Sequence, residues 1–284
     1  SFDTKNVTDM REMFCCCSSV TEINLGKLDF ALSESFYCMF SWCPNLEKLD
    51  VSQFDTKRVT DMSMMFNAMT YITTLDVKNF DTRKVEDMYL MFGGMSYLTS
   101  LDVSKFKTSK CTDMCQMFQD CQKLTSLDIS GFDTTLVTDM SSMFQYCEKL
   151  VITGLNKINT ARVTDMSHMF QRLSAMSSLD ISNFNVEEVI DFSYMFSYNY
   201  QLQSLNLNNF KTTNARLFDY TFSNCQNLKE INLEHFLTDE VRSMVCMFQS
   251  CGAVTYLDLS SFRTTKVESM YGMFSSMRKI TSLD

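Results

Sequence analysis

Proline and glycine are scarce in this chain, which contains one Pro and seven Gly among its 284 residues. Flexible linkers and turn-rich connections depend on these residues, so their scarcity leaves little room for a tether between separate domains. Together with an uninterrupted repeat of 26 residues, described below, this predicts a single domain over residues 1–284. Long apolar runs are also missing, and none approaches the length that a membrane-spanning helix needs.

Positive charge is in short supply as well. The chain has 25 Lys and Arg residues and 34 Asp and Glu residues, so its net charge is −9. Nucleic acids and anionic membrane surfaces attract proteins that carry clustered Lys and Arg. The charge therefore argues against both as partners of this chain.

Groups that perform enzymatic chemistry are few. The two His residues, His168 and His235, lie in different parts of the chain, and neither belongs to a triad-like or metal-ligand motif. No Gly-rich phosphate-binding loop is present. A glycosidase-type carboxylate pair is an alternative that the Asp residues alone leave open, although the periodicity of the chain explains those residues better. The sequence predicts a protein that is not an enzyme and has no cofactor.

A period of 26 residues runs through the chain without an insertion or a deletion. A fixed period of this length is typical of a solenoid, in which each coil packs against its neighbours. The sequence predicts about eleven coils. Because the chain begins and ends inside a repeat, we expect it to be the repeat region of a longer protein. The landmark of the period is a Phe at positions 14, 40, 66, 92, 118, 144, 170, 196, 222, 248 and 274.

Each coil is predicted to contain one short strand and one short helix. The segment 49–52 alternates apolar and polar residues, which is typical of a strand with Leu49 and Val51 facing the core. Apolar residues at helical spacing then predict a short helix, whose first N–H groups are capped by Thr60 or Asp61. Stacked coils would place their strands in a parallel ladder. The inward helix positions of this coil are Met62, Met65, Phe66 and Met69.

Cysteine and methionine are abundant, with 12 Cys and 23 Met. One repeat position holds Cys in several coils and Met or Leu in others, which indicates a buried apolar slot rather than a disulfide framework. Most Met residues fall on the inward helix positions, so we interpret them as core rather than as an exposed binding groove. A disulfide is left open for Cys246 and the segment 15–17. The slot is occupied by Cys17, Cys43, Cys121, Cys147, Cys225 and Cys251.

Asp residues also recur, so that stacking would form rows of carboxylates. Carboxylates about 5 Å apart repel by roughly 1–3 kcal/mol per pair. Capping of N–H groups offsets this repulsion in the row at the helix start, and Ser and Thr neighbours with water do so on the strand. Calcium between coils is the alternative, but the spacing of dedicated calcium loops is missing, so the sequence predicts no metal site. The rows contain Asp50, Asp76, Asp102 and Asp128 on the strand, and Asp61, Asp87, Asp113, Asp139, Asp165 and Asp191 at the helix start.

Candidate binding residues are those that depart from the repeat or point outward. The outward strand positions are mostly Ser, Thr and Asp, which fits either a flat binding face or a solvated one. Aromatic residues at variable positions are more discriminating, because clustered exposed aromatics mark interfaces and sugar-stacking sites. Four Tyr fall in two neighbouring coils, and another two share one repeat position in adjacent coils. The candidates are Tyr194, Tyr198, Tyr200, Tyr220, Tyr71, Tyr97 and Trp42.

The run LDVSxFDTxxVTDMSxMF spans residues 49–66 and recurs, with Ile in place of Val, at 127–144. It resembles the 26-residue leucine-rich repeats of BspA-like bacterial and mycoplasma surface proteins, and the similarity covers essentially the whole chain. The resemblance implies a leucine-rich-repeat-like solenoid that is exported and displayed at the cell surface, with adhesion or host-factor binding as its role. It implies no catalytic residue. The segments 28–37 and 215–221 depart from the motif.

Two functions are in keeping with these features. The first is a non-enzymatic, adhesin-type binding scaffold at the cell surface or outside the cell, whose partner is a host or neighbouring-cell protein or glycan. The second is a structural subunit that stacks head to tail into an extracellular fibre. The fibre hypothesis rests on the repeat, because a chain that ends at Asp284 and restarts at Ser1 is nearly in step with the period.

Overall fold

The structure of the chain is a computed structural model that describes residues 3–26 and 28–283. The chain divides into two compact units. The first unit comprises Ser1–Leu136 and Tyr146–Lys157, and the second comprises Val137–Gln145 and Ile158–Asp284. The expectation of one domain over the whole chain stays a prediction. Among the described residues, no helix is long and apolar enough to cross a membrane.

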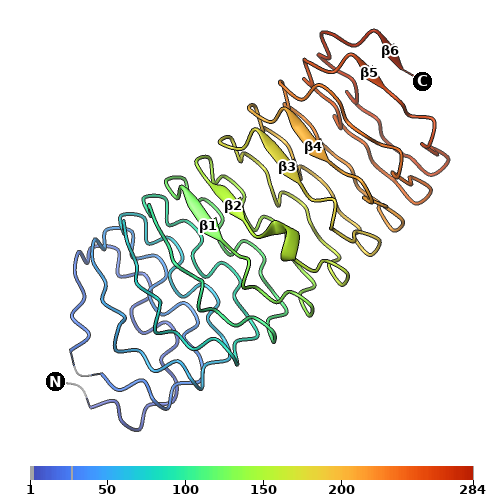
Figure 1. Ribbon diagram of the computed structural model, residues 1–284. Helices are drawn as coiled ribbons and strands as arrows, with labels where there is room; N and C mark the ends of the chain where they lie inside the picture. The colour runs from blue at the N-terminus through green and yellow to red at the C-terminus, as the bar shows by residue number, and fades with distance from the viewer. Residues whose placement is uncertain (1–2, 27, 284) are drawn as a thin grey trace. The chain divides into compact units, whose positions relative to one another are not determined.

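Parallel strand pairs join neighbouring coils in each unit (Figure 1). In the first unit, β1 (Ser126–Asp128) pairs with β2 (Val151–Thr153), which is followed by the short 3-10 helix η1 (Leu155–Lys157). In the second unit, β3 (Ser178–Asp180) pairs with β4 (Ser204–Asn206), and β5 (Tyr256–Leu257) pairs with β6 (Ser282–Leu283). Single bridges such as Thr74 to Ser100 continue the same pairing one repeat apart. The predicted parallel ladder between coils is confirmed.

The predicted short helix is wrong. The segment 62–69 is instead a series of turns, and Met64 and Ala68 have φ angles of 55° and 56° in the left-handed region. Every second N–H group of this segment donates to a carbonyl of the next coil, as Met64 does to Tyr89 at 2.7 Å and Phe66 to Met91 at 3.0 Å. In an α-helix those N–H groups would donate to carbonyls of the same segment, and the carbonyls of the neighbouring coil would lose their donors.

The inward positions were nevertheless predicted correctly, because the turns bury the same side chains as a helix would. Met62, Met65, Phe66 and Met69 are all 0% exposed. The Phe landmark forms a stack through each unit. Phe66 lies 5.8 Å from Phe92 at an interplanar angle of 16°, and Phe222 lies 5.6 Å from Phe248 at 2°.

The predicted core position of the Cys slot is confirmed for five of its six Cys residues, and it is wrong for Cys17, which is only half-buried. Cys43, Cys121, Cys147, Cys225 and Cys251 are 0% exposed. Each thiol donates to the carbonyl of a Phe in the preceding coil, for example Cys225 to Phe196 at 3.1 Å. Burial raises the pKa of Cys251 to about 12, which keeps this thiol protonated. All twelve Cys are free thiols.

Candidate functional site

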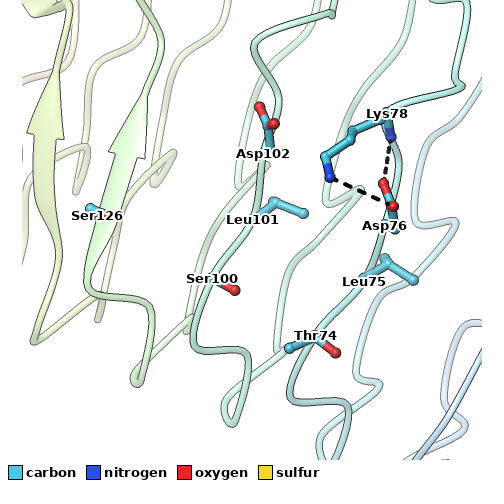
Figure 2. A pocket seen from close by; sticks show the side chains of 8 residues that line it. All are labelled: Thr74, Leu75, Asp76, Lys78, Ser100, Leu101, Asp102 and Ser126. Carbon is cyan, nitrogen blue, oxygen red and sulfur yellow. Dashed lines mark hydrogen bonds and ion pairs between the residues drawn. The ribbon is translucent and has the colours of Figure 1, made fainter.

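A hollow lies on the outward strand face of the first unit, with a volume of about 290 Å³. Strand segments of successive coils run side by side here, so side chains at equivalent repeat positions become neighbours (Figure 2). Alternation along each strand turns Leu75 and Leu101 toward the core, where they are 5% and 9% exposed. The residues that line the hollow are Thr74, Leu75, Asp76, Lys78, Ser100, Leu101, Asp102 and Ser126.

The carboxylates of this hollow are held by the backbone two residues further along. Asp76 accepts the N–H of Lys78 at 3.1 Å, and its other oxygen lies 3.8 Å from the Lys78 ammonium (Figure 2). Asp102 accepts the N–H of Ser104 at 3.0 Å. Hydrogen bonds from Ser104 lower the pKa of Asp102, so this carboxylate stays ionised at neutral pH.

The same bond to residue i+2 explains how rows of Asp are tolerated. On the strand row, Asp180 accepts the N–H of Ser182 at 3.0 Å. In the other row, Asp87 accepts the N–H of Tyr89 at 2.8 Å, so the carboxylate binds a backbone N–H as predicted, but it closes a turn and caps no helix. Burial, followed by repulsion from Asp61, raises the pKa of Asp87.

No metal site is evident at these rows. Within residues 3–26 and 28–283, no group of three or more His, Cys, Asp or Glu side chains is arranged to hold a metal ion. The absence of a cofactor stays a prediction from the sequence. What the hollow offers chemically is hydrogen bonding: its hydroxyls donate and accept, its carboxylates accept, and one ammonium donates.

Tyr71 and Tyr97 form an exposed aromatic pair in the first unit. They are 48% and 46% exposed, and their ring centroids lie 5.2 Å apart at an interplanar angle of 44°. Each precedes a strand segment of the hollow by three residues, since Thr74 and Ser100 line it. Trp42 lies in the same unit and is 58% exposed. Sequence reasoning found the Tyr pair because one repeat position was aromatic in adjacent coils.

The four Tyr candidates of the second unit form two separate contacts instead of one cluster. Tyr194 stacks on Tyr220 at 4.6 Å and 9°, while Tyr198 meets the edge of Tyr200 at 6.1 Å and 78°. Of the four, Tyr194, Tyr198 and Tyr220 are half-buried, and Tyr200 is exposed in part at the turn. The two contacts involve different repeat positions, so membership of neighbouring coils was not a sufficient signal for one patch.

His168 extends the first of these contacts, and sequence reasoning missed it. Its ring stacks on Tyr194 at 4.7 Å and 8°. Its Nδ1 lies 2.9 Å from Oε1 of Gln171 and 3.1 Å from Nε2 of Gln145. A hydrogen bond with Cys246 is the main cause that raises the pKa of Tyr220 to about 12. The signal was available, because His168, Tyr194 and Tyr220 share one repeat position in successive coils.

Comparison with protein families gives a match over nearly the whole sequence. The model of the family described as "Mycoplasma protein of unknown function, DUF285" matches residues 1–74, 65–178, 149–255 and 218–283. A search of curated proteins finds no match.

Several solved structures are similar at low identity. A leucine-rich cell surface protein from Faecalibacterium prausnitzii is 14% identical, with 89% of this chain and 75% of that chain covered and a TM-score of 0.38. An internalin from Listeria monocytogenes is 14% identical, with coverages of 89% and 72% and a TM-score of 0.31. A leucine-rich-repeat protein from Bacteroides ovatus is 16% identical, with coverages of 86% and 74% and a TM-score of 0.32. With TM-scores this low, we draw neither fold nor function from them.

Proposed function

This chain belongs to the family described as "Mycoplasma protein of unknown function, DUF285", and we propose that it is a non-enzymatic binding scaffold of the adhesin type. In this proposal the chain is displayed at the cell surface or outside the cell and binds a protein or glycan of a host or neighbouring cell. Binding takes place through the outward strand face and the exposed aromatic residues. The resemblance of the repeat to BspA-like surface proteins supports the location.

The observation that carries the proposal is the outward surface around the hollow. The large apolar side chains of the repeat are mostly buried in the core, where Phe66 and Phe92 are 0% exposed. Against that background, Tyr71 and Tyr97 are large aromatic residues left in solvent beside a hollow lined by polar groups. Exposed aromatics next to a polar depression are typical of binding surfaces.

Two measurements test this function. Antibody labelling of intact cells of the source organism should reach the chain without permeabilisation, whereas labelling only after permeabilisation would contradict surface display. Purified chain should also bind saturably to at least one member of a combined array of host proteins and glycans. Failure to bind any member of either half of the array would contradict the scaffold proposal.

The head-to-tail fibre stays a prediction. It depends on the ends of the chain, and Ser1, Phe2 and Asp284 lie outside the described residues. Negative-stain imaging over a range of protein concentrations discriminates the two functions. Filaments that lengthen with concentration would favour the fibre, and single particles at every concentration would contradict it.

A further inference from the structure

The Tyr pair and the hollow are contributed by the same coils. Tyr71 leads directly into the strand segment of Thr74, and Tyr97 into that of Ser100. Three residues span at most about 10 Å, so the backbone of each Tyr lies within about 10 Å of a residue that lines the hollow. In other coils this repeat position holds no aromatic residue, but Ser19, Asn45, Lys123, Lys149, Ala175, Gln201, Asn227, Ala253 and Lys279.

The two rings form an open platform rather than a closed stack. At a centroid distance of 5.2 Å and an angle of 44°, Tyr71 and Tyr97 do not cover each other face to face. Both side chains remain nearly half exposed. Phenol rings in this arrangement can pack against the apolar C–H face of a pyranose ring, which buries apolar surface on both partners.

The lining of the hollow suits a polyhydroxylated ligand better than a protein side chain. A volume of about 290 Å³ is at the small end of ligand sites, which range over roughly 300–1,000 Å³. Energetic centres of protein interfaces are desolvated pockets for large side chains. Here Leu75 and Leu101 expose little apolar surface, and the other lining groups are hydroxyls, carboxylates and one ammonium.

The charges around the hollow favour a neutral ligand. The carboxylates of Asp76 and Asp102 outnumber the single ammonium of Lys78, and the whole chain has a net charge of −9. Sulfated or sialylated chains would therefore meet repulsion at this surface. A neutral sugar would accept hydrogen bonds from Lys78 and donate its hydroxyl protons to the carboxylates.

We propose that Tyr71, Tyr97 and the hollow between Thr74 and Asp102 form one binding site for a neutral oligosaccharide. The rings pack on the apolar face of one sugar unit, and the hollow hydrogen-bonds the hydroxyls of another. This inference rests on the proposed binding function and names its ligand class.

The first experiment applies the full chain to an array of neutral oligosaccharides beside matched sialylated and sulfated ones. The expected result is binding confined to neutral members. Calorimetric titration with the strongest neutral member should give nearly the same affinity at low and high salt, because no ionic attraction is involved. Binding that requires sialic acid or sulfate, or that weakens steeply with salt, would overturn the ligand class.

The second experiment locates the site with matched variants. Tyr97→Ala and Asp102→Asn should each lower the affinity of the chain for the titrated neutral oligosaccharide by roughly tenfold or more. Tyr271→Ala is the control for the first, since Tyr271 is the most exposed large apolar residue of the described chain at 77%. Asp180→Asn is the control for the second, because Asp180 makes the same bond to residue i+2 in the other unit. Both controls should bind like the unchanged chain.

The outcomes separate this inference from the proposed function. If the array shows protein binding and no glycan binding, the oligosaccharide site is wrong while the scaffold stands. If neutral glycans bind and the site and control variants are indistinguishable, the ligand class stands and the site is wrong. If nothing binds, both proposals are contradicted. Near-identical circular dichroism of all variants, whose altered side chains are exposed, excludes misfolding as the cause.

Discussion

The hydroxyl of Thr212 joins two coils through Leu237: it donates to the Leu237 carbonyl at 2.9 Å and accepts the Leu237 N–H at 2.9 Å. Thr212 is 0% exposed and Leu237 is half-buried, so both backbone groups would lose their partner at a partly buried position without this hydroxyl. Equivalent pairs recur 26 residues apart, for example between Thr82 and Lys107 at 3.0 and 2.7 Å. A buried polar side chain therefore connects neighbouring coils at this repeat position.

Replacing this hydroxyl should destabilise the chain. Thr212→Val keeps the shape of the side chain and leaves the partly buried N–H and carbonyl of Leu237 without their partner, which should lower the free energy of unfolding by about 1–3 kcal/mol. Thr213→Val is the matched control, because Thr213 is the next residue and is exposed. Denaturant unfolding of both variants measures the effect, and equal stabilities would show that the buried hydroxyl contributes nothing.

The left-handed turns predict the sign of a glycine substitution. Ala68 has a φ angle of 56°, and the equivalent residue of the next coil is Gly94 at 71°. Ala68→Gly relieves the clash of an L side chain in this region, so we expect a gain in stability of about 1 kcal/mol. In a helix the same change would instead cost about 1 kcal/mol.

Ala31→Gly is the control for this test, since Ala31 is exposed and its φ angle is not in the left-handed region. It should give no gain. Thermal or denaturant unfolding of the two variants compares them directly, and a loss of stability in Ala68→Gly would favour the helix that the spacing predicted.

The half-buried row of Asp residues that contains Asp87 predicts a pH-dependent effect on stability. Burial and repulsion from Asp61 raise the pKa of Asp87 above its ordinary value of 3.8. The contribution of Asp87 to the free energy of unfolding is therefore fully present below about pH 4, and it is lost as the pH rises through the raised pKa. Asp87→Asn should then be more stable than the unchanged chain at neutral pH, with the advantage vanishing in acid. The amide oxygen can still accept the Tyr89 N–H.

For Asp180→Asn we expect an effect on stability of the opposite sign. Hydrogen bonds from Ser182 lower the pKa of Asp180, so its contribution is present above the ordinary pKa and is lost as the pH falls. This variant should lose stability at neutral pH. Urea titrations at several pH values measure both variants, and an effect of the same sign in both would contradict the burial argument.

The sequence predicted which residues form the core, but not the conformation of the segment that holds them. Met62 and Phe66 were assigned to the core because helical spacing and the turns of this fold bring the same positions inward. The turns were missed because Met64 and Ala68 adopt positive φ without the Gly that normally signals it. The demand for hydrogen bonds between coils, which is a tertiary effect, determines that conformation.

The candidate site was predictable where repeat position determined contact. Tyr71 and Tyr97 were paired correctly, since equal positions in adjacent coils become neighbours. Tyr194 and Tyr198 differ by four positions in one coil, and the structure assigns them to different contacts. Lys78 could not be assigned from sequence, because its place in the hollow depends on the ion pair with Asp76.

The central claim is that a ligand contacts the outward surface around Tyr71 and Tyr97, and ring-labelled tyrosine NMR tests it most directly. The chain contains 11 Tyr, whose signals can be assigned by single Tyr→Phe variants. On addition of the neutral oligosaccharide selected by the array, the ring signals of Tyr71 and Tyr97 should shift while that of Tyr271 stays in place. Unchanged Tyr71 and Tyr97 signals at saturating ligand would contradict the account.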